Sequence, residues 1–340
     1  MADRFPFPGR VGLTAISAGY FMKRDFVSLT GFSKDEISEI FELSGWLKEQ
    51  PRPDYRPLAG KSAALIFEKP SLRTHVSFQV GISQLGGDAI FLSQENIGLS
   101  MRESVRDAAE VLSRYNDLII ARTMAHRTVE ELAAHSSVPV INALTDRLHP
   151  CQILADAFTL RERGLLSEGA KIAFIGDGNN VVNSWLELAG VIPIHFVLAC
   201  PEKYQPDPDI LMLAKAAKIS RIEIVRDAYA AAEDADVLYT DVWVSMGQEG
   251  ERCAREAAFK NYQVNAKLLR EASPRCLVMH CLPAHRGEEI TADVLEGEHS
   301  IVMEQAENRL HVQKAIIAHL LEEGQPERED RRTFSRVLEG

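Results

Sequence analysis

The sequence is poor in the features that mark several classes of protein. Its 340 residues include five cysteines, an odd number without a Cys-x-x-Cys pair. We therefore expect neither a disulfide framework nor a cysteine-ligated zinc site. No apolar run reaches the ~18 residues of a membrane span. The segment 1–26 lacks a basic start followed by a long apolar core. This argues against a secretory signal, and the few arginines together with Asp3 argue against a transit peptide, so we expect a cytoplasmic protein.

Positive charge is also in deficit. The chain has 38 Lys and Arg against 49 Asp and Glu, a net charge of -11. A nucleic acid is disfavoured as the main partner, because binding a polyanion needs a basic face. A small anionic substrate is compatible with this charge, since a local group of arginines can invert the field inside a cleft.

Short apolar runs alternate with segments of helical periodicity along the chain, which predicts parallel sheets with crossover helices. The runs are rich in Val, Ile and Leu, as expected of strands that are buried on both faces. The ten runs are SAALIF, AIFL, DLIIAR, VPVINAL, KIAFIGD, HFVLAC, IEIVRD, DVLYTDVWV, RCLVMHCLP and SIVMEQ. Because ten strands are many for one domain, we predict an α/β protein with two doubly wound parallel-sheet domains.

The predicted boundary lies near His149, where a helix leads into the strand KIAFIGD. We assign residues 1–148 to the first domain and 149–308 to the second. A late helical segment, 309–323, is expected to pack back on the first domain. The charged segment 324–340 is expected to be a loose tail. Near the start, Ser33 and Glu36 have the spacing of a capping box and predict the N-terminus of a helix.

Polar residues gather where predicted strands end. In open parallel sheets, ligands bind beyond the carboxyl ends of the strands. Seven strand ends carry such residues, which predicts a site in a cleft between the two domains. They are EKPSLRTH, Arg122, HPCQ, GDGNN, DVWVSMGQE, LPAHRG and QAENR.

The motif SLRTH, residues 71–75, has two interpretations of similar weight. A Ser/Thr-rich loop that opens a helix offers backbone N–H groups and hydroxyls to a phosphate, and Arg73 adds a bidentate donor. The alternative is an ordinary helix cap at the surface with incidental charges.

The motif GDGNN, residues 176–180, lacks the third glycine of a dinucleotide-binding fingerprint, because Val181 occupies that position. A nicotinamide cofactor is therefore disfavoured. The pair Asn179 and Asn180, followed by Asn183, suits a carboxylate or an amino group, or simply a polar turn with a helix cap.

In HPCQ, His149 can donate to a carbonyl oxygen and Gln152 can accept from an NH2 group. The alternative for this motif is a helix start with proline in the first turn.

Two further strand ends suit an amino-acid ligand. Asp241 can pair with an ammonium group, and Ser245 with the backbone of Met246 can take a carboxylate. The motif HCLP, residues 280–283, places Cys281 and the carbonyl of Leu282 at a strand end. No His and Asp pair is locally attached to Cys281, so a cysteine hydrolase is weakly supported.

Taken in order, these motifs resemble those of the ornithine carbamoyltransferases, over roughly residues 25 to 323. The matching pieces are FEKPSLRTHVSF, ESVRDAAEVLSRY, HPCQILAD, GDGNNVVNS, DVWVSMGQE, HCLPA and QAENR. SMGQE and HCLP are the specific ones, because they indicate ornithine rather than aspartate as the acceptor.

The resemblance implies transfer of a carbamoyl group from carbamoyl phosphate to the δ-amine of ornithine, without a metal or organic cofactor. It implies a carbamoyl phosphate site formed by Ser71, Leu72, Arg73, Thr74, Arg122, His149, Gln152 and Arg309. It implies an ornithine site formed by Asn180, Asp241, Ser245, Met246, Cys281 and Leu282. The residues expected at the reacting groups are Arg122, His149, Cys281 and Arg309.

The resemblance also implies a homotrimer, in which a neighbour's loop, here about Asn96 to Glu103, completes the site. Three positions depart from the family pattern, and all lie on the carbamoyl phosphate side. Leu72 and His75 replace the usual Thr and Arg of the phosphate loop, and Gly98 replaces the usual Gln or His of the neighbour's loop.

Three alternative functions are kept beside this one. One is a carbamoyltransferase with another amine acceptor, such as putrescine, although such an acceptor would leave the partners of an α-carboxylate and an α-amino group idle. Another is a non-catalytic paralogue that binds ornithine without dependence on carbamoyl phosphate. A nicotinamide oxidoreductase is the third, disfavoured by Val181.

Overall fold

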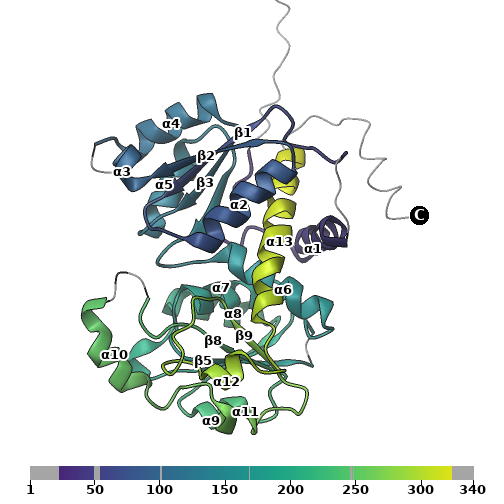
Figure 1. Cartoon of the computed structure of the whole chain (residues 1–340), viewed down its shortest axis with the longest axis vertical. Coiled ribbons are helices and arrows are strands. Elements are labelled where there is room, and N and C mark those ends of the chain that lie inside the picture. Colours follow the sequence, from purple (N-terminus) through teal and green to yellow (C-terminus); the bar gives the residue numbers. More distant parts are fainter. Residues whose placement is uncertain are drawn as a thin grey trace, which may run out of the picture.

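The computed structural model contains two parallel β-sheets, joined by helices that run between them (Figure 1). The first sheet has the strand order β2-β1-β3-β4 and the second β7-β6-β5-β8-β9, and all pairings are parallel. This confirms the predicted fold class. The structure describes residues 23–49, 54–99, 102–167, 169–245, 247 and 249–323.

Nine of the ten predicted strands form within the described residues. They are β1 Ser62–Phe67, β2 Asp88–Ser93, β3 Leu118–Arg122, β4 Val140–Leu144, β5 Lys171–Ile175, β6 His195–Ala199, β7 Arg221–Val225, β8 Val237–Thr240 and β9 Leu277–His280. The tenth, SIVMEQ, was a wrong prediction. Ser300 makes an isolated bridge with Val278, and a helix begins at Val302. A short apolar run does not distinguish a strand from the start of a buried helix.

The helices separate and cover the strands. They are α1 Lys34–Glu49, α2 Leu72–Gln84, α3 Gln94–Ile97, α4 Val105–Tyr115, α5 His126–His135, α6 Pro150–Glu162, α7 Asn180–Ala189, α8 Pro208–Ala217, α9 Ala228–Ala232, α10 Arg252–Phe259, α11 Ala266–Leu269, α12 Ala292–Leu295 and α13 Val302–Glu323. Short 3-10 turns occur at Glu202–Tyr204 and Glu249–Glu251. Among the described residues, no helix is long and apolar enough to cross a membrane.

Two helix starts follow the sequence signals. Ser33 and Glu36 form the predicted capping box: the Ser33 backbone N–H donates to the Glu36 carboxylate at 2.6 Å, and the Glu36 N–H donates to the Ser33 hydroxyl at 3.3 Å. Helix α6 begins at Pro150, directly after His149. A proline is tolerated there because its missing N–H would have no partner within the helix.

Each strand divides its side chains between two cores, because successive residues point to opposite faces of a sheet. On β1, Ala63, Leu65 and Phe67 face a core shared with α1, α2, α6 and α13. Ala64 and Ile66 face α4 and α5 on the other side. The first sheet is thus covered by helices on both faces.

The second sheet is divided in the same way. On β5, Ile172 and Phe174 belong to the shared core, whereas Ala173 and Ile175 face α9, α10 and α11. Helix α6 is buried on all sides from Pro150 to Leu160. It therefore lies at the centre of a core that is continuous between the two halves.

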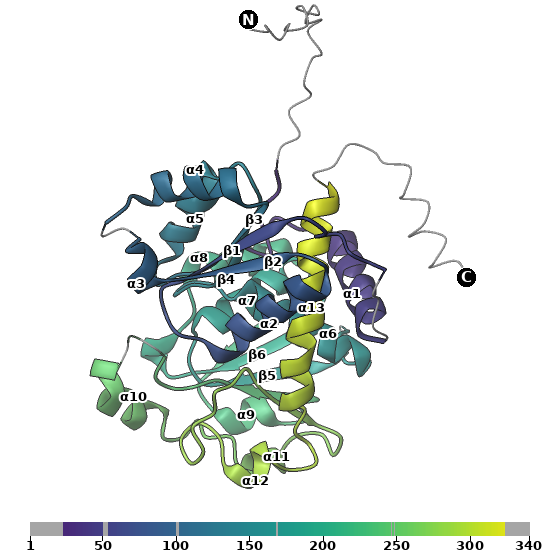
Figure 2. The same ribbon diagram turned by 45° about the horizontal axis from the view of Figure 1, so that its top comes forward.

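Helix α13 returns from the second sheet to the first and packs against α6, α1 and α2 (Figure 2). Its first turn contacts the second half, since Gln305 accepts the backbone N–H of His280 at the end of β9, at 3.0 Å. The domain boundary near His149 and the extents 1–148 and 149–308 stay predictions. The segment 324–340 lies outside the described residues.

Asp156 joins three of these elements at the centre of the core. Its carboxylate, fully buried on α6, accepts from the Tyr239 hydroxyl of β8 at 2.7 Å, and from the Gln152 and Gln305 amides at 2.8 Å each. Burial nevertheless raises the pKa of Asp156 to about 6, because these donors offset only part of the lost hydration.

We predict that Asp156 makes stability depend on pH. Its pKa is higher in the folded than in the unfolded chain, so its contribution is fully present below about pH 4 and is lost as the pH rises through about 6. Relative to Asp156→Asn, the wild type should lose up to about 3 kcal/mol of unfolding free energy between pH 4 and 7, since one pKa unit is about 1.36 kcal/mol.

Urea unfolding followed by tryptophan fluorescence, at steps across this range, measures the difference. Asp35→Asn, at an exposed position of α1, is the matched control and should show no such change between pH 5 and 7. A difference in unfolding free energy between the wild type and Asp156→Asn that stays constant from pH 4 to 7 would contradict the prediction.

Candidate active site

The predicted phosphate loop opens helix α2. The Ser71 hydroxyl caps the helix by accepting the Thr74 backbone N–H at 3.4 Å, and no acidic residue lies in the first turn. The helix-cap interpretation of SLRTH is therefore confirmed, and the phosphate interpretation stays a prediction. The cap arranges a helix N-terminus, with its free N–H groups and positive dipole end, which is suited to an anion.

Two arginines from distant parts of the chain meet on this loop. The hydroxyl of Thr74, 1% exposed, accepts from Arg122 at 3.3 Å and from Arg309 at 2.8 Å. Arg122 is the last residue of β3, where the register with β4 shifts between Ala121 and Arg122. Such an irregularity re-aims the side chain at the strand end. Arg309 lies on α13, so three elements converge on one hydroxyl.

Arg73 joins these two arginines in a group of positive charges. Burial lowers the pKa of Arg122 to about 10, and repulsion from Arg309 and Arg73 adds to the effect. Burial likewise lowers the pKa of Arg309 and of Arg73. Among the described residues, no carboxylate forms an ion pair with any of the three, and the Nε atom of each lacks a hydrogen-bond partner. Buried cations without a counter-ion favour an anionic ligand.

His149 and Gln152 lie beside this group at the start of α6. Burial lowers the pKa of His149 well below its ordinary value, and the three arginines add to this, so its imidazole is neutral. Its Nδ1 atom has no partner in the described structure. The amide nitrogen of Gln152 donates to Asp156 at 2.8 Å, which leaves the buried Oε1 of Gln152 as an unpartnered acceptor.

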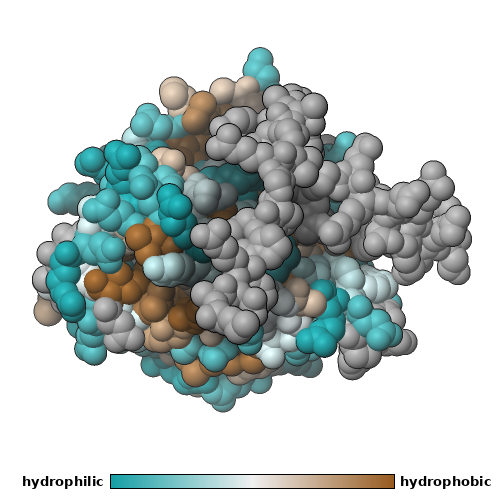
Figure 3. All heavy atoms as spheres, turned by 90° about the horizontal axis from the view of Figure 1, so that it is seen from above, coloured by the Kyte–Doolittle hydropathy of each residue, from teal (hydrophilic) through white to brown (hydrophobic). Residues whose placement is uncertain are grey.

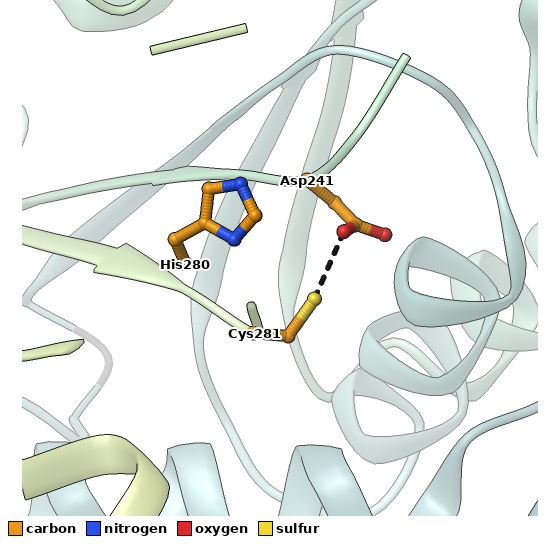
Figure 4. A group of neighbouring side chains, drawn as sticks. All are labelled: Asp241, His280 and Cys281. Atoms are coloured by element: carbon orange, nitrogen blue, oxygen red, sulfur yellow. Dashed lines mark hydrogen bonds between the residues drawn. The ribbon is translucent and has the colours of Figure 1, made fainter. Parts of the chain in front are cut away.

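The predicted acceptor side is built around Asp241, at the end of β8. Its carboxylate accepts from the Cys281 thiol at 2.9 Å (Figure 4). It also accepts from the Asn179 amide at 2.8 Å. Burial raises the pKa of Cys281 well above its ordinary value, and Asp241 adds to the shift, so the sulfur is a neutral thiol. A protonated thiol is a poor nucleophile, which argues further against a cysteine hydrolase.

The donor and acceptor sides are close enough to interact. The Asp241 carboxylate acts electrostatically on Arg73 and opposes the effect of burial on the pKa of that guanidinium. Residues from the carboxyl ends of both sheets are therefore brought together, as the pattern of strand ends predicts.

A cavity of about 330 Å³ lies elsewhere, between α5, α7 and α8, and none of the predicted site residues lines it.

Some predicted residues have other contacts, and one residue was missed. The Asn180 amide donates to the carbonyl of Thr145 at 2.7 Å, and its neighbour Asn179 bonds to Asp241 instead. Ser245 is half-buried, and Met246 lies outside the described residues. The sequence signal for Asn179 is the same Asn pair, but only the cap geometry at α7 separates the two roles.

Two of the three departures from the family pattern lie on α2 beside Arg73, and the third lies at the end of α3. Leu72 is 77% exposed. The ring of His75 stacks on Phe91 of β2, with 4.0 Å between centroids. Gly98 ends α3 with φ +61°, where an added Cβ would approach the Arg102 side chain to 2.8 Å. The neighbour's loop is described only in part, since residues 100 and 101 lie outside the described ranges.

Comparison with known proteins gives a consistent result. The aspartate/ornithine carbamoyltransferase family models match residues 24–162, as the carbamoyl-P binding domain, and 168–320, as the Asp/Orn binding domain. An ornithine carbamoyltransferase of Chlorobaculum tepidum is 54% identical over 88% of this chain and 90% of its own length. A chloroplastic ornithine carbamoyltransferase of Pisum sativum is 49% identical over 88% of this chain and 80% of its own.

The solved structure of an ornithine carbamoyltransferase from Pyrococcus furiosus superposes with a TM-score of 0.82, at 43% identity, over 88% of this chain and 97% of that one. An N-acetyl-L-ornithine transcarbamylase superposes with a TM-score of 0.77 at 30% identity, over 87% and 99%. Together with the geometry described above, these matches show that the chain belongs to the aspartate/ornithine carbamoyltransferase family.

Proposed function

We propose that this protein transfers the carbamoyl group of carbamoyl phosphate to the δ-amine of L-ornithine, giving L-citrulline and phosphate. The observation that carries the proposal is the meeting of three guanidinium groups, without a carboxylate counter-ion among the described residues, next to the Asp241–Cys281 pair. Such an arrangement suits a doubly charged phosphate on one side and an amine on the other.

The donor site follows from the loop at α2. We assign the phosphate to the hydroxyls of Ser71 and Thr74, the backbone at Leu72, and the side chains of Arg73 and Arg122. A guanidinium offers paired N–H donors that match phosphate oxygens. The exposed side chain of Leu72 is compatible with a role through its backbone alone.

The carbamoyl group is assigned to the start of α6 and to α13. Neutral His149 and charged Arg309 can donate to the carbonyl oxygen, and the free Oε1 of Gln152 can accept from the NH2 group. Negative charge develops on the carbonyl oxygen during attack, and fixed donors in a water-poor site stabilise that charge strongly.

The chemistry requires a neutral amine. An alkylamine has an unperturbed pKa of about 10.4, and a site rich in arginine favours its deprotonated form. The amine nitrogen forms a bond to the carbonyl carbon, the bond from that carbon to the phosphate oxygen breaks, and the amine proton leaves on the phosphate. Positioning and electrostatics then supply most of the acceleration.

Ornithine is favoured over a plain diamine by the acceptor side. Asp241 can pair with the α-ammonium group, and Asn180, Ser245 and Met246 with the α-amino and α-carboxylate groups. We place the δ-amine near Cys281 and the carbonyl of Leu282. Putrescine has no α-carboxylate or α-ammonium group, so the residues assigned to those groups would have no ligand, which is unfavourable for a buried group such as Asp241.

We also propose a homotrimer, which the first half of the chain supports. Helix α2 exposes Leu72, Val76 and Val80, and the neighbouring strand β2 exposes Ile90 and Phe91. Figure 3 shows apolar side chains gathered among hydrophilic ones on the face seen from above. Because β2 is an edge strand, an apolar face there is expected to be covered by another chain.

The proposal extends to a role in arginine biosynthesis in the cytoplasm. The five cysteines are all free thiols, and one of them, Cys253, is exposed. Free thiols are the usual state in a reducing compartment.

We predict that Arg309→Gln lowers kcat for citrulline formation about 100- to 1,000-fold, the usual loss when one oxyanion donor is removed. Arg161→Gln removes an arginine of α6 that pairs with Glu42 outside the site, and it should keep wild-type turnover. A colorimetric citrulline assay at saturating substrates measures both. An Arg309→Gln enzyme with more than a tenth of wild-type kcat would contradict the assignment.

We predict turnover with ornithine and none with putrescine or N-acetylornithine in the same assay. Asp241→Asn should lower kcat/KM for ornithine about 100-fold or more, because a buried ammonium partner is lost. Asp209→Asn, on the exposed first turn of α8, is the control. Turnover with putrescine that Asp241→Asn leaves unchanged would favour the other acceptor. Ornithine binding without any turnover would favour the non-catalytic paralogue.

We predict a mass of three subunits for the wild type by size-exclusion chromatography with light scattering. Ile90→Lys should shift the protein towards a single subunit, because it places a charge in the covered edge of β2. Met212→Lys changes a more exposed apolar residue on α8 and should leave the mass unchanged. A single-subunit mass for the wild type would refute the trimer.

A further inference from the structure

We propose that His280 and Glu289 position the backbone of Cys281 and Leu282 for the acceptor amine. The inference rests on the proposed function for its catalytic consequence, but its structural core can be tested without turnover. Neither residue is among the site residues that the resemblance implies. Both act through the chain and not by contact with substrate.

The two residues form a completely buried pair. His280, the last residue of β9, and Glu289 are each 0% exposed, and the His280 Nε2 atom lies 3.0 Å from the Glu289 Oε1 atom. The same carboxylate oxygen accepts the backbone N–H of His285 at 2.6 Å. Burying a carboxylate costs free energy unless hydrogen-bond donors contact it. Glu289 therefore favours the form of His280 in which Nε2 carries a proton and donates to the carboxylate.

The other ring nitrogen of His280 holds the site backbone. The Leu282 N–H donates to His280 Nδ1 at 2.8 Å. Because a backbone N–H is only a donor, Nδ1 must be the acceptor, and the ring proton lies on Nε2, facing Glu289. Glu289 thus selects the tautomer that allows His280 to accept from Leu282.

Leu282 needs such a restraint. Its φ is +56°, in the left-handed region that branched side chains rarely occupy. A residue keeps this strained backbone conformation only where contacts with the surrounding structure hold it there. The bond to His280 supplies one restraint, and the backbone N–H of His280 is itself fixed by Gln305 of α13 at 3.0 Å.

The restraint lies directly beside the predicted acceptor side. Figure 4 shows the imidazole of His280 next to Cys281, whose thiol is bonded to Asp241. The His280–Glu289 pair therefore fixes the backbone that carries the carbonyl of Leu282 and the thiol of Cys281. A displacement of about 1 Å at a reacting group can lower a rate about 100-fold.

A matched pair of variants separates the two halves of this arrangement. In His280→Asn, the side-chain oxygen can take the place of Nδ1 and accept from Leu282, but it cannot reach Glu289. In His280→Gln, the amide nitrogen can reach Glu289, but no acceptor remains at the position of Nδ1, because the amide oxygen lies one carbon farther along the side chain. Met279→Leu, a volume-conserving change on the same strand at a fully buried position, is the control for packing.

Hydrogen exchange at the Leu282 amide is the first measurement, made by mass spectrometry with electron-transfer fragmentation on the full-length protein. We expect protection to persist in His280→Asn and Met279→Leu and to fall at least about tenfold in His280→Gln. Equal protection in His280→Gln and the wild type would overturn the proposal, whether or not the protein turns over ornithine.

Kinetics give the second measurement. We expect His280→Gln to lower kcat/KM for ornithine at least about tenfold and to leave the dissociation constant of carbamoyl phosphate within about twofold of wild type. Equal weakening towards both substrates would indicate a general structural role and would overturn the proposal. Failure of the wild type itself to form citrulline would refute the proposed function, while the exchange measurement would still decide the role of His280.

Discussion

The candidate site depends on one contact across the chain, the bond from Arg309 of α13 to the hydroxyl of Thr74 on α2. It holds a third guanidinium beside Arg73 and Arg122, although like charges in a buried place repel one another and burial disfavours their charged forms. The hydrophobic packing of α13 on α1, α2 and α6 sustains this arrangement. The apolar core thus supports an electrostatic arrangement that would not persist by itself.

Strand positions and strand ends were readable from the sequence, because buried parallel strands give compact apolar runs and their carboxyl ends carry polar residues. The exception is SIVMEQ, where Ile301 and Val302 are buried as in a strand, but Ile301 follows the bridge residue Ser300 and Val302 begins a helix. Asn179 could not be separated from Asn180, because residue type alone does not reveal which side chain caps the helix. Asp156 has no signal either, since nothing local marks a helical aspartate as fully buried.

The departures from the family pattern acquire a physical meaning in the structure. His75 does not extend a cation towards Thr74, because its ring stacks on Phe91, and its Nε2 is buried without a partner. Leu72 directs no polar group inward. The side chains at these two positions therefore shape the apolar face of α2 and β2 more than the arginine group, which is complete without them.

The place of Arg309 also bears on how the protein is made. A ribosome releases the first sheet and the whole of SLRTH long before it reaches α13, the last described helix. Until then the faces of α1 and α2 that α13 covers are exposed, and Thr74 lacks one of its two guanidinium donors. The nascent chain can form its strands early, but the anion site is completed only when Arg309 has been synthesised. A protein cut short before residue 309 would therefore keep Arg73, Thr74 and Arg122 but would lack Arg309, and its donor site would be incomplete.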